Sequence, residues 1–266
     1  MIFCFGYGYV AHDLGGMGTS RTPQEPNQLL YTGGPFSKDI LDALSQCQHI
    51  LISIPPGEEG DPLIPYIKQE LRSFKHIEWV GYLSSTSVYG NHEGAWVDET
   101  STTHPTSPQG IARFKAEHQW LTLDLPIHIF RLAGIYGPGR NVLVELKAGR
   151  AHRIFKKGVV FSRIHVSDII QALKASISSP HIGRIYNLAD NCPAPSHDVV
   201  AYGASLLGID PPPLIPYEDA KLSPMLSSFY TDSKRVKNDR LLKELIPSLL
   251  FPTYKEGLQS LNQESV

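Results

Sequence analysis

Short apolar runs alternate with longer polar segments along the first half of the chain. Five segments are predicted as strands: 2–5, 17–21, 49–54, 77–83 and 127–132. Helices are predicted at 37–46, with Ser37 as N-cap, and at 65–73 and 108–122. The polar, turn-rich segment 22–36 predicts a loop or a degenerate helix. Strands that alternate with helices in this way indicate an α/β fold, with a doubly wound parallel sheet covered on both faces.

The pattern is less regular after residue 137. Helices are predicted at 142–148, 166–177, 196–207, 234–245 and 252–261, with Ser196 as the N-cap of the third. Short strands are predicted at 164–166, 185–188 and 214–215. We therefore expect this part of the chain to form a smaller lobe rather than an independent domain.

A glycine-rich turn follows the first predicted strand directly. Gly6, Gly8 and Ala11 make a GxGxxA pattern. Gly6 allows a tight turn, Gly8 lets the backbone approach a pyrophosphate, and the small Ala11 lets the next helix pack close to the strand. The expected dinucleotide-binding segment is Gly6, Tyr7, Gly8, Tyr9, Val10 and Ala11. An ordinary strand-to-helix turn is the alternative.

This motif makes the predicted sheet Rossmann-like and suggests how the chain is divided. We expect residues 1–140 to form an NAD(P)-binding core. Residues 141–266 are then a mixed C-terminal part, which forms a small substrate lobe and completes the core.

The end of the second predicted strand bears on the choice of cofactor. An acidic residue there would bind a ribose 2′-hydroxyl, whereas an arginine accommodates a 2′-phosphate. Arg21 stands at this place, and the nearby acid Glu25 lies beyond the strand between two prolines. The sequence therefore favours NADP over NAD, with a solvated loop arginine as the alternative interpretation of Arg21. Ser53, Ile54 and Pro55 end the next buried strand and are expected to line the ribose side of the cofactor, although simple turn chemistry also accounts for Ser53.

Three further segments resemble the extended short-chain dehydrogenases/reductases, the NAD(P)-dependent epimerase/dehydratase group. They are LSSTSVYG at 83–90, RLAGIYGPGR at 131–140 and FSRIHVSD at 161–168. With the glycine turn they cover about residues 1–190 in the order that this family has. The ending of the chain, at 222–225 and 251–254, resembles an atypical subgroup with poorly defined activity.

The resemblance implies a catalytic serine with a Tyr-Lys pair. The serine maps onto Ser85, beside a cofactor contact at Ser84, and holds the substrate hydroxyl or carbonyl. The tyrosine exchanges the proton, and the lysine four residues later lowers the pKa of the tyrosine. Here Gln109 occupies the tyrosine position and Arg113 the lysine position. Gln109 cannot act as an acid or base near neutral pH, whereas Arg113 can still contact a ribose or a carboxylate.

Other candidates carry two interpretations each. Tyr89 or Tyr136 can supply a replacement hydroxyl, or each can be a structural tyrosine that caps a loop. His165 and Asp168 match the family segment, but a buried or helix-capping role is the favoured interpretation of both. Arg140 and Arg163 can bind an anionic substrate or lie solvated at the surface. The eleven histidines show no HExxH pattern and no ligand spacing with cysteine, so we expect no metal site.

Composition excludes several classes of protein. The net charge of -2 and the pI of about 6.6 give no broad electrostatic footprint for nucleic acid or an anionic membrane. No apolar run approaches the ~18–20 residues of a membrane span. The three cysteines are distant in sequence and predict reduced thiols. We expect a cytoplasmic monomer or homodimer whose first residues lead into the fold with no targeting segment before them.

Two functions follow from these observations. The first is an NAD(P)-binding oxidoreductase or epimerase-like protein of the atypical group, without the Tyr-Lys pair, that acts on a sugar nucleotide or a carbonyl compound. The second is a catalytically inactive NADP(H)-binding sensor or regulatory protein.

Overall fold

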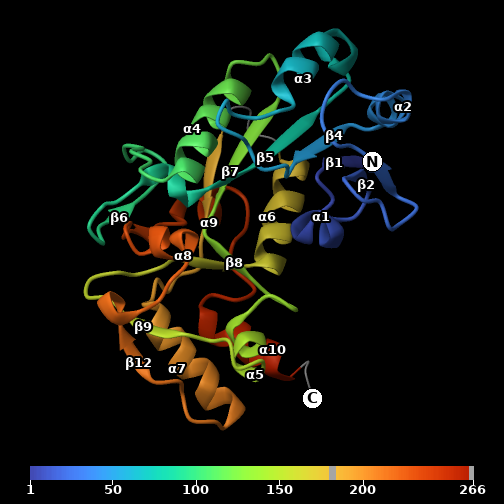
Figure 1. Cartoon of the computed structure of the whole chain (residues 1–266). Coiled ribbons are helices and arrows are strands. Elements are labelled where there is room, and N and C mark those ends of the chain that lie inside the picture. The colour runs from blue at the N-terminus through green and yellow to red at the C-terminus, as the bar shows by residue number, and fades with distance from the viewer. Residues whose placement is uncertain (180–183, 264–266) are drawn as a thin grey trace. The chain divides into compact units, whose positions relative to one another are not determined.

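The computed structural model describes residues 1–179 and 184–263 (Figure 1). They divide into two compact units that are interleaved along the chain. Unit 1 comprises Met1–Val88, Ser107–Arg131 and Ile170–Tyr186, and unit 2 comprises Tyr89–Thr106, Leu132–Ile169 and Asn187–Val266. A single boundary at residues 140/141 stays a prediction about domains.

The central sheet has seven strands in the order β11-β7-β5-β4-β1-β2-β3. Their bounds are β1 Ile2–Phe5, β2 Met17–Ser20, β3 Gln28–Leu30, β4 His49–Ile52, β5 Trp79–Ser85, β7 Ile127–Leu132 and β11 Ile185–Leu188. The neighbours from β3 to β5 pair in parallel. The order extends in both directions from β1, as in a doubly wound sheet, so the predicted Rossmann-like fold is confirmed.

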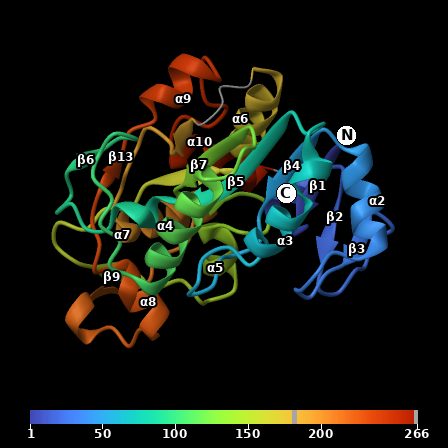
Figure 2. The same cartoon turned by 90° about the horizontal axis from the view of Figure 1, so that it is seen from above.

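Helices lie on both faces of the sheet (Figure 2). They are α1 Tyr9–Leu14, α2 Lys38–Gln46, α3 Ile64–Glu70, α4 Pro108–Leu121 and α6 Val166–Ser178. The alternation of side chains along β5 shows why both faces need a cover. Trp79 points to one face, where its indole Nε1 donates to Ser176 of α6 at 3.0 Å. Tyr82 points to the other face and packs on Trp120 of α4, with ring centroids 6.2 Å apart.

A buried ion pair joins α4 to β7 in unit 1. Glu117 and Arg131 are 1% and 5% exposed, and the Arg131 guanidinium donates from Nη2 at 2.7 Å and from Nε at 3.0 Å to the two Glu117 carboxylate oxygens. The Ser84 hydroxyl of β5 donates to the same carboxylate at 2.6 Å. One carboxylate therefore fixes the helix against two strands, and it does so where β5 ends.

Unit 2 contains short elements. Its helices are α5 Val142–Lys147, α7 Ser196–Leu207, α8 Pro224–Phe229, α9 Asp239–Glu244 and α10 Tyr254–Gln263. Three parallel pairs of strands accompany them: β8 Gly134–Tyr136 with β10 Arg163–His165, β9 Arg153–Phe155 with β12 Leu214–Pro216, and β6 Trp96–Val97 with β13 Arg235–Val236. Helices α5, α7 and α10 pack around an apolar cluster that includes Leu143, Val199 and Leu258.

Three predictions of local structure are wrong. The segment 22–36 contains β3, because Gln28–Leu30 extends the parallel ladder beside β2. The segment 234–245 is not one helix, since the backbone N–H groups of Arg235 and Lys237 donate to the carbonyl oxygens of Ala95 and Val97 before α9 begins. The N-cap of α7 is Pro195, so Ser196 is the first helical residue and makes no capping bond there.

The predicted strands at 2–5 and 127–132 and the helix that begins after Ser37 are confirmed, and Ser37 caps α2 through the N–H of Ile40. Within the described ranges, no helix is long and apolar enough to cross a membrane.

The buried pair makes the first testable prediction. Glu117→Ala removes the carboxylate and leaves the buried Arg131 charge uncompensated, which should cost about 3–5 kcal/mol of unfolding free energy. Glu145→Ala is the matched control, because Glu145 also accepts two hydrogen bonds from one arginine but lies on the surface. Denaturant unfolding followed by circular dichroism measures both. Equal stability of the two variants would contradict the assigned role of Glu117.

Candidate functional site

The candidate cofactor residues gather at one edge of the sheet in unit 1. In the parallel register Phe5 lies beside Ile52, and Ile52 lies beside Tyr82. The residues that follow these strands therefore emerge side by side. In the spatial order β2-β1-β4-β5 they are Arg21, then Gly6 to Gly8, then Ser53 to Pro55, and Ser84 and Ser85 end β5 itself. This edge, at the carboxyl ends of the strands, is where such sheets bind ligands.

The glycine turn is fixed by its neighbours in the sheet. Gly6 has φ +89°, and its N–H donates to the Thr19 hydroxyl of β2 at 2.9 Å. A Cβ on Gly6 would lie 3.1 Å from the backbone nitrogen of Ile54, so both conformation and space favour glycine there. A Cβ on Gly8 would meet nothing within 4 Å, and Gly8 is exposed. Contacts within the protein therefore account for a glycine at position 6. No contact within the described protein requires one at position 8, where the space is open.

The other residues of the predicted dinucleotide-binding segment differ in how far their side chains are buried. Val10 and Ala11 are buried on α1, and Tyr9 is half-buried. The Tyr7 hydroxyl accepts a hydrogen bond from the Asn27 side chain at 2.8 Å. Thr19 was not among the candidates, because its role depends on the pairing of β1 with β2, which no local motif announces.

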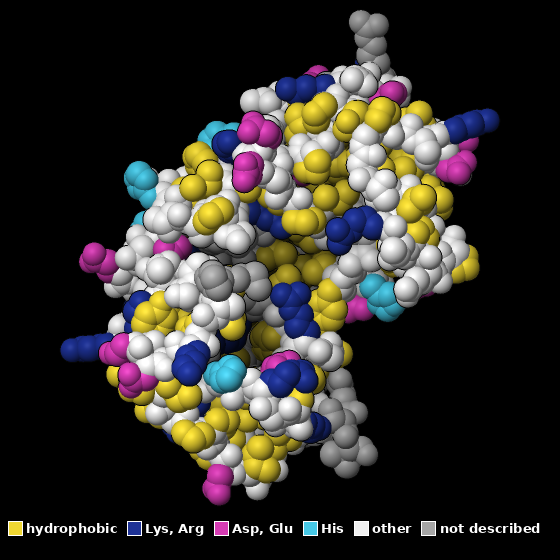
Figure 3. Space-filling model, viewed as in Figure 1, with side chains coloured by type: hydrophobic (Ala, Val, Ile, Leu, Met, Phe, Trp, Pro, Cys, Tyr) yellow, Lys and Arg dark blue, Asp and Glu magenta, His cyan; other side chains and the backbone are white. Residues whose placement is uncertain are grey.

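Arg21 lies one residue beyond β2 and is exposed. Within the residues that the structure describes, its guanidinium makes no hydrogen bond or ion pair. Its charge is therefore available to an anion at the outer end of the sheet edge. Figure 3 shows basic and acidic side chains interspersed over the face in view, and the expected lack of a nucleic-acid partner stays a prediction.

Ser84 and Ser85 differ in their contacts although they are adjacent. The Ser84 hydroxyl is committed to Glu117, whereas Ser85 is half-buried and its hydroxyl accepts the backbone N–H of Ser87 at 3.1 Å. Within the described residues the Ser85 hydroxyl donates no hydrogen bond, so its proton can serve another group.

Arg113 lies on the face of α4 that approaches the same strand end. Its Nη1 donates to the carbonyl oxygen of Leu83 at 2.5 Å, and its guanidinium lies 5.8 Å from the centre of the Tyr82 ring. Gln109 is exposed and stands one turn earlier on α4, after the N-cap Ser107. The structure therefore brings Arg113 to the end of β5, next to the serine segment.

Both candidate tyrosines belong to unit 2. Tyr89 is fully buried, and its hydroxyl donates to the Asn187 side chain at 2.7 Å. Tyr136 lies across Gly257 of α10 and donates to the backbone oxygen of Thr253 at 3.5 Å. Burial, reinforced by the carboxyl of Asp190, raises the pKa of Tyr136 above its usual range. These contacts are those of structural tyrosines, and a catalytic role for either stays a prediction.

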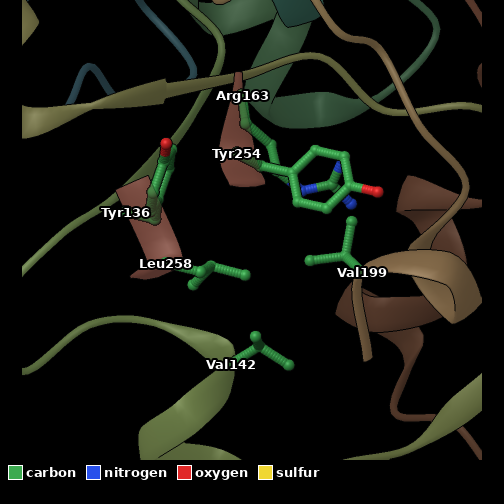
Figure 4. Close-up of a pocket in the computed structure, with 6 residues that line it drawn as sticks. All are labelled: Tyr136, Val142, Arg163, Val199, Tyr254 and Leu258. Atoms are coloured by element: carbon green, nitrogen blue, oxygen red, sulfur yellow. The ribbon is translucent and has the colours of Figure 1, made fainter. Parts of the chain in front are cut away.

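A cavity lies wholly within unit 2, between β8, β10, α5, α7 and α10. Figure 4 shows the residues that line it, which are Tyr136, Val142, Arg163, Val199, Tyr254 and Leu258. Arg163 is half-buried, and Nη1 donates to the backbone oxygens of Phe161 and Ala194 at 2.9 and 3.0 Å. Arg163 was a candidate for anion binding, but the apolar walls around it come from elements too far apart in sequence to be predicted together.

Asp190 is a buried acid of unit 2 that the sequence does not reveal. It is 1% exposed; its Oδ1 accepts the backbone N–H of Cys192 at 3.0 Å, and its Oδ2 has no hydrogen-bond partner within the described residues. Burial raises the pKa of this carboxyl to about 7, although the Arg163 charge acts in the opposite direction.

No family model matches the chain. A functionally unknown conserved protein from Silicibacter pomeroyi is 42% identical, with a TM-score of 0.90 over 99% of this chain and 98% of its own. The chain belongs to the same family as this conserved protein. Protein YeeZ of Escherichia coli is 35% identical over 186 residues, which span 65% of this chain and 64% of the length of YeeZ.

The family shares its fold with NAD(P)-dependent epimerases and dehydratases, so the resemblance to the extended short-chain dehydrogenases/reductases is confirmed for the fold. The human epimerase family protein SDR39U1, solved with NADPH, has a TM-score of 0.74 at 15% identity, over 99% of each chain. Other structures of this fold contain NAD.

The segment 161–168, which contains His165 and Asp168, makes structural contacts in unit 2. Asp168 accepts the backbone N–H groups of Leu250 and Phe251 at 2.6 and 3.2 Å, and the His165 ring lies 4.1 Å from that of Phe251. Asp168 thus holds the segment that precedes α10. Arg140 is exposed in the turn after β8. No cluster of three metal-ligating side chains occurs in the described part of the chain, and the expectation of a metal-free site stays a prediction.

Asp190 makes the second testable prediction. Because its pKa is higher in the folded protein than the usual 3.8, the folded state binds a proton that the unfolded chain has lost. Stability should therefore fall as the pH rises from about 4 to 7 and stay low above. Asp190→Asn removes this pH-dependent contribution. The stability of the variant relative to the unmodified protein should therefore be about 1–3 kcal/mol greater at pH 8 than at pH 5.

Denaturant unfolding at the two pH values measures this difference, and Asp210→Asn, an exposed acid, is the control. The same free-energy difference between Asp190→Asn and the unmodified protein at pH 5 and pH 8 would show that the burial of Asp190 has no such effect.

Proposed function

We propose that this protein binds NADP(H) at the carboxyl edge of the unit 1 sheet and is an NAD(P)-dependent oxidoreductase or epimerase-like protein with an atypical site. The observation that carries the proposal is the order along that edge: a free arginine, an open glycine turn, a serine after β4 and a serine at the end of β5. An extended dinucleotide presents its 2′-phosphate, pyrophosphate and nicotinamide in a matching order.

The turn fits a pyrophosphate. Space is open at Gly8, and the adjoining Gly6 is held by the Thr19 hydroxyl of the neighbouring strand. Arg21 supports NADP over NAD, since a charge-assisted contact to a 2′-phosphate contributes about 1.5–3 kcal/mol. NAD is the second candidate.

The reacting groups proposed for this chain are few. The nicotinamide, when bound, supplies or accepts a hydride. Ser85 donates its hydroxyl to a substrate carbonyl, and Arg113, anchored on the Leu83 carbonyl, orients that segment and places a positive charge there. Gln109 contributes hydrogen bonds but no proton. Tyr89 and Tyr136 are the candidates for a replacement hydroxyl, and a sugar nucleotide or a carbonyl compound is the proposed substrate class.

The missing acid supports a second candidate function, a catalytically inactive NADP(H)-binding sensor or regulatory protein. With Gln109 and Arg113 in place of the Tyr-Lys pair, slow turnover is expected even if the cofactor binds. In both cases we propose a cytoplasmic protein that is a monomer or a homodimer.

The third prediction tests cofactor binding. Gly8→Asp places a negative charge where the pyrophosphate lies and should weaken NADP binding by at least ~2 kcal/mol. Arg21→Ala should lower NADP affinity about tenfold or more and leave NAD affinity nearly unchanged. Calorimetric titration of the full chain with both cofactors measures these values.

Glu25→Ala is the matched control, because Glu25 is an exposed charge near Arg21 but lies beyond the strand. Unchanged NADP affinity in a folded Gly8→Asp variant would contradict the site, and tighter binding of NAD than of NADP by the unmodified protein would contradict only the cofactor preference.

The fourth prediction concerns turnover. General acid catalysis contributes about 10²–10⁴-fold, so NADPH oxidation with sugar nucleotides or carbonyl compounds should be weak or absent. Any activity should be lost in Ser85→Ala, and Gln109→Tyr with Arg113→Lys should raise it. Stopped-flow absorbance at the NADPH band measures the rate.

A kcat well above ~10 s⁻¹, lost on Gln109→Ala and kept in Ser85→Ala, would overturn the assignment of roles. Cofactor binding with no turnover in any variant would support the sensor function instead.

A further inference from the structure

The cavity in unit 2 is lined by apolar side chains and one arginine, and none of these residues belongs to the proposed cofactor site in unit 1. Its volume of about 80 Å³ exceeds the ~10–15 Å³ that a single water needs, so it accommodates several non-hydrogen atoms but not a sugar nucleotide. Val142, Val199 and Leu258 form apolar walls on three different helices (Figure 4). Among the described residues that line the cavity, Arg163 is the charged one.

The guanidinium of Arg163 is held through only one of its nitrogens in the described part of the chain. Both bonds to the carbonyls of Phe161 and Ala194 use Nη1. Within the described residues, Nε and Nη2 make no hydrogen bond, so their N–H groups have no acceptor in the protein. The edge formed by Nε and Nη2 is a fork of two parallel N–H groups, which matches the two oxygens of a carboxylate.

We infer that the cavity is a binding site for a short aliphatic monocarboxylate, with the carboxylate on the Nε and Nη2 edge of Arg163 and the alkyl chain among Val142, Val199 and Leu258. A sugar fits poorly, because the apolar walls offer few partners for its hydroxyl groups. Phosphate fits poorly as well, because the apolar walls offer few partners for its further oxygens.

The surrounding charges predict how binding depends on pH. Asp190 interacts with Arg163 of β10, Asp168 of α6 and Glu256 of α10, and with neighbouring Cys192. As the pH rises from 6 to 8, Asp190 loses its proton and its negative charge opposes an incoming carboxylate. Binding should therefore be several-fold weaker at pH 8 than at pH 6, and Asp190→Asn should abolish this difference.

The test titrates the full chain with sodium butyrate at pH 6, followed by chemical shifts in NMR spectra. Six non-hydrogen atoms and one charged contact suggest a Kd of about 1 mM. Butyramide has the same shape without the charge and should bind at least about tenfold more weakly. Acetate, which lacks two methylene groups, should also bind more weakly by about tenfold or more.

Two variants divide the roles of the charge and the cavity. Arg163→Lys keeps a positive charge but loses the fork, and Val199→Leu fills the cavity and leaves Arg163 unchanged; each should weaken butyrate binding about tenfold. Arg150→Gln is the matched control, because Arg150 is an exposed arginine of unit 2 that pairs with Glu145, and it should bind butyrate normally.

Equal binding of butyrate and butyramide would overturn the proposal. The absence of saturation at ~100 mM butyrate would overturn it too, because the cavity would then be only a packing void. Unchanged affinity in Val199→Leu would place butyrate elsewhere and would overturn it too. If Arg163→Lys does not fold, the butyramide and Val199→Leu measurements still decide. None of these outcomes depends on NADP(H), so they stand apart from the tests of the proposed function.

Discussion

One buried carboxylate organises unit 1. Glu117 receives two N–H groups of Arg131 from β7 and the hydroxyl of Ser84 from β5, and all three groups are nearly closed to solvent. A charge in such a place is tolerated only when its partners hold it, because an unpaired buried charge costs several kcal/mol. These hydrogen bonds hold helix α4 in its register on the sheet. That register determines which residues of α4 reach the end of β5.

The candidate site follows from this constraint. With Glu117 fixed, Arg113 lies one turn earlier on the same helix and reaches the Leu83 carbonyl, while Gln109 lies a further turn away at the exposed start of α4. The two adjacent serines then have different tasks. Ser84 supports the architecture through Glu117, and Ser85 presents a hydroxyl at the edge where the glycine turn and Ser53 emerge.

Much of the fold could be predicted from the sequence, because the strands of unit 1 are apolar runs and the GxGxxA turn has a local physical cause. The failures arise where pairing overrides local pattern. The segment 234–245 has helical spacing, yet Arg235 and Val236 extend β6, and Gln28–Leu30 forms an edge strand within a polar stretch. The site was predictable in its local motifs, such as Gly6 and Ser85. Thr19 and Asp190 were not, since their environment is made by residues distant in sequence.

The tryptophans of the chain lie in unlike surroundings, and this has a practical consequence. Trp79 and Trp120 are fully buried on opposite faces of the sheet, where Trp79 donates to Ser176 and Trp120 donates to Asp61 at 2.9 Å, whereas Trp96 is 51% exposed. Replacing Trp96 by phenylalanine would leave two indoles shielded from water. The intrinsic emission of such a protein would be an optical record of unit 1 alone, with Trp79 reporting the α6 face and Trp120 the α4 face.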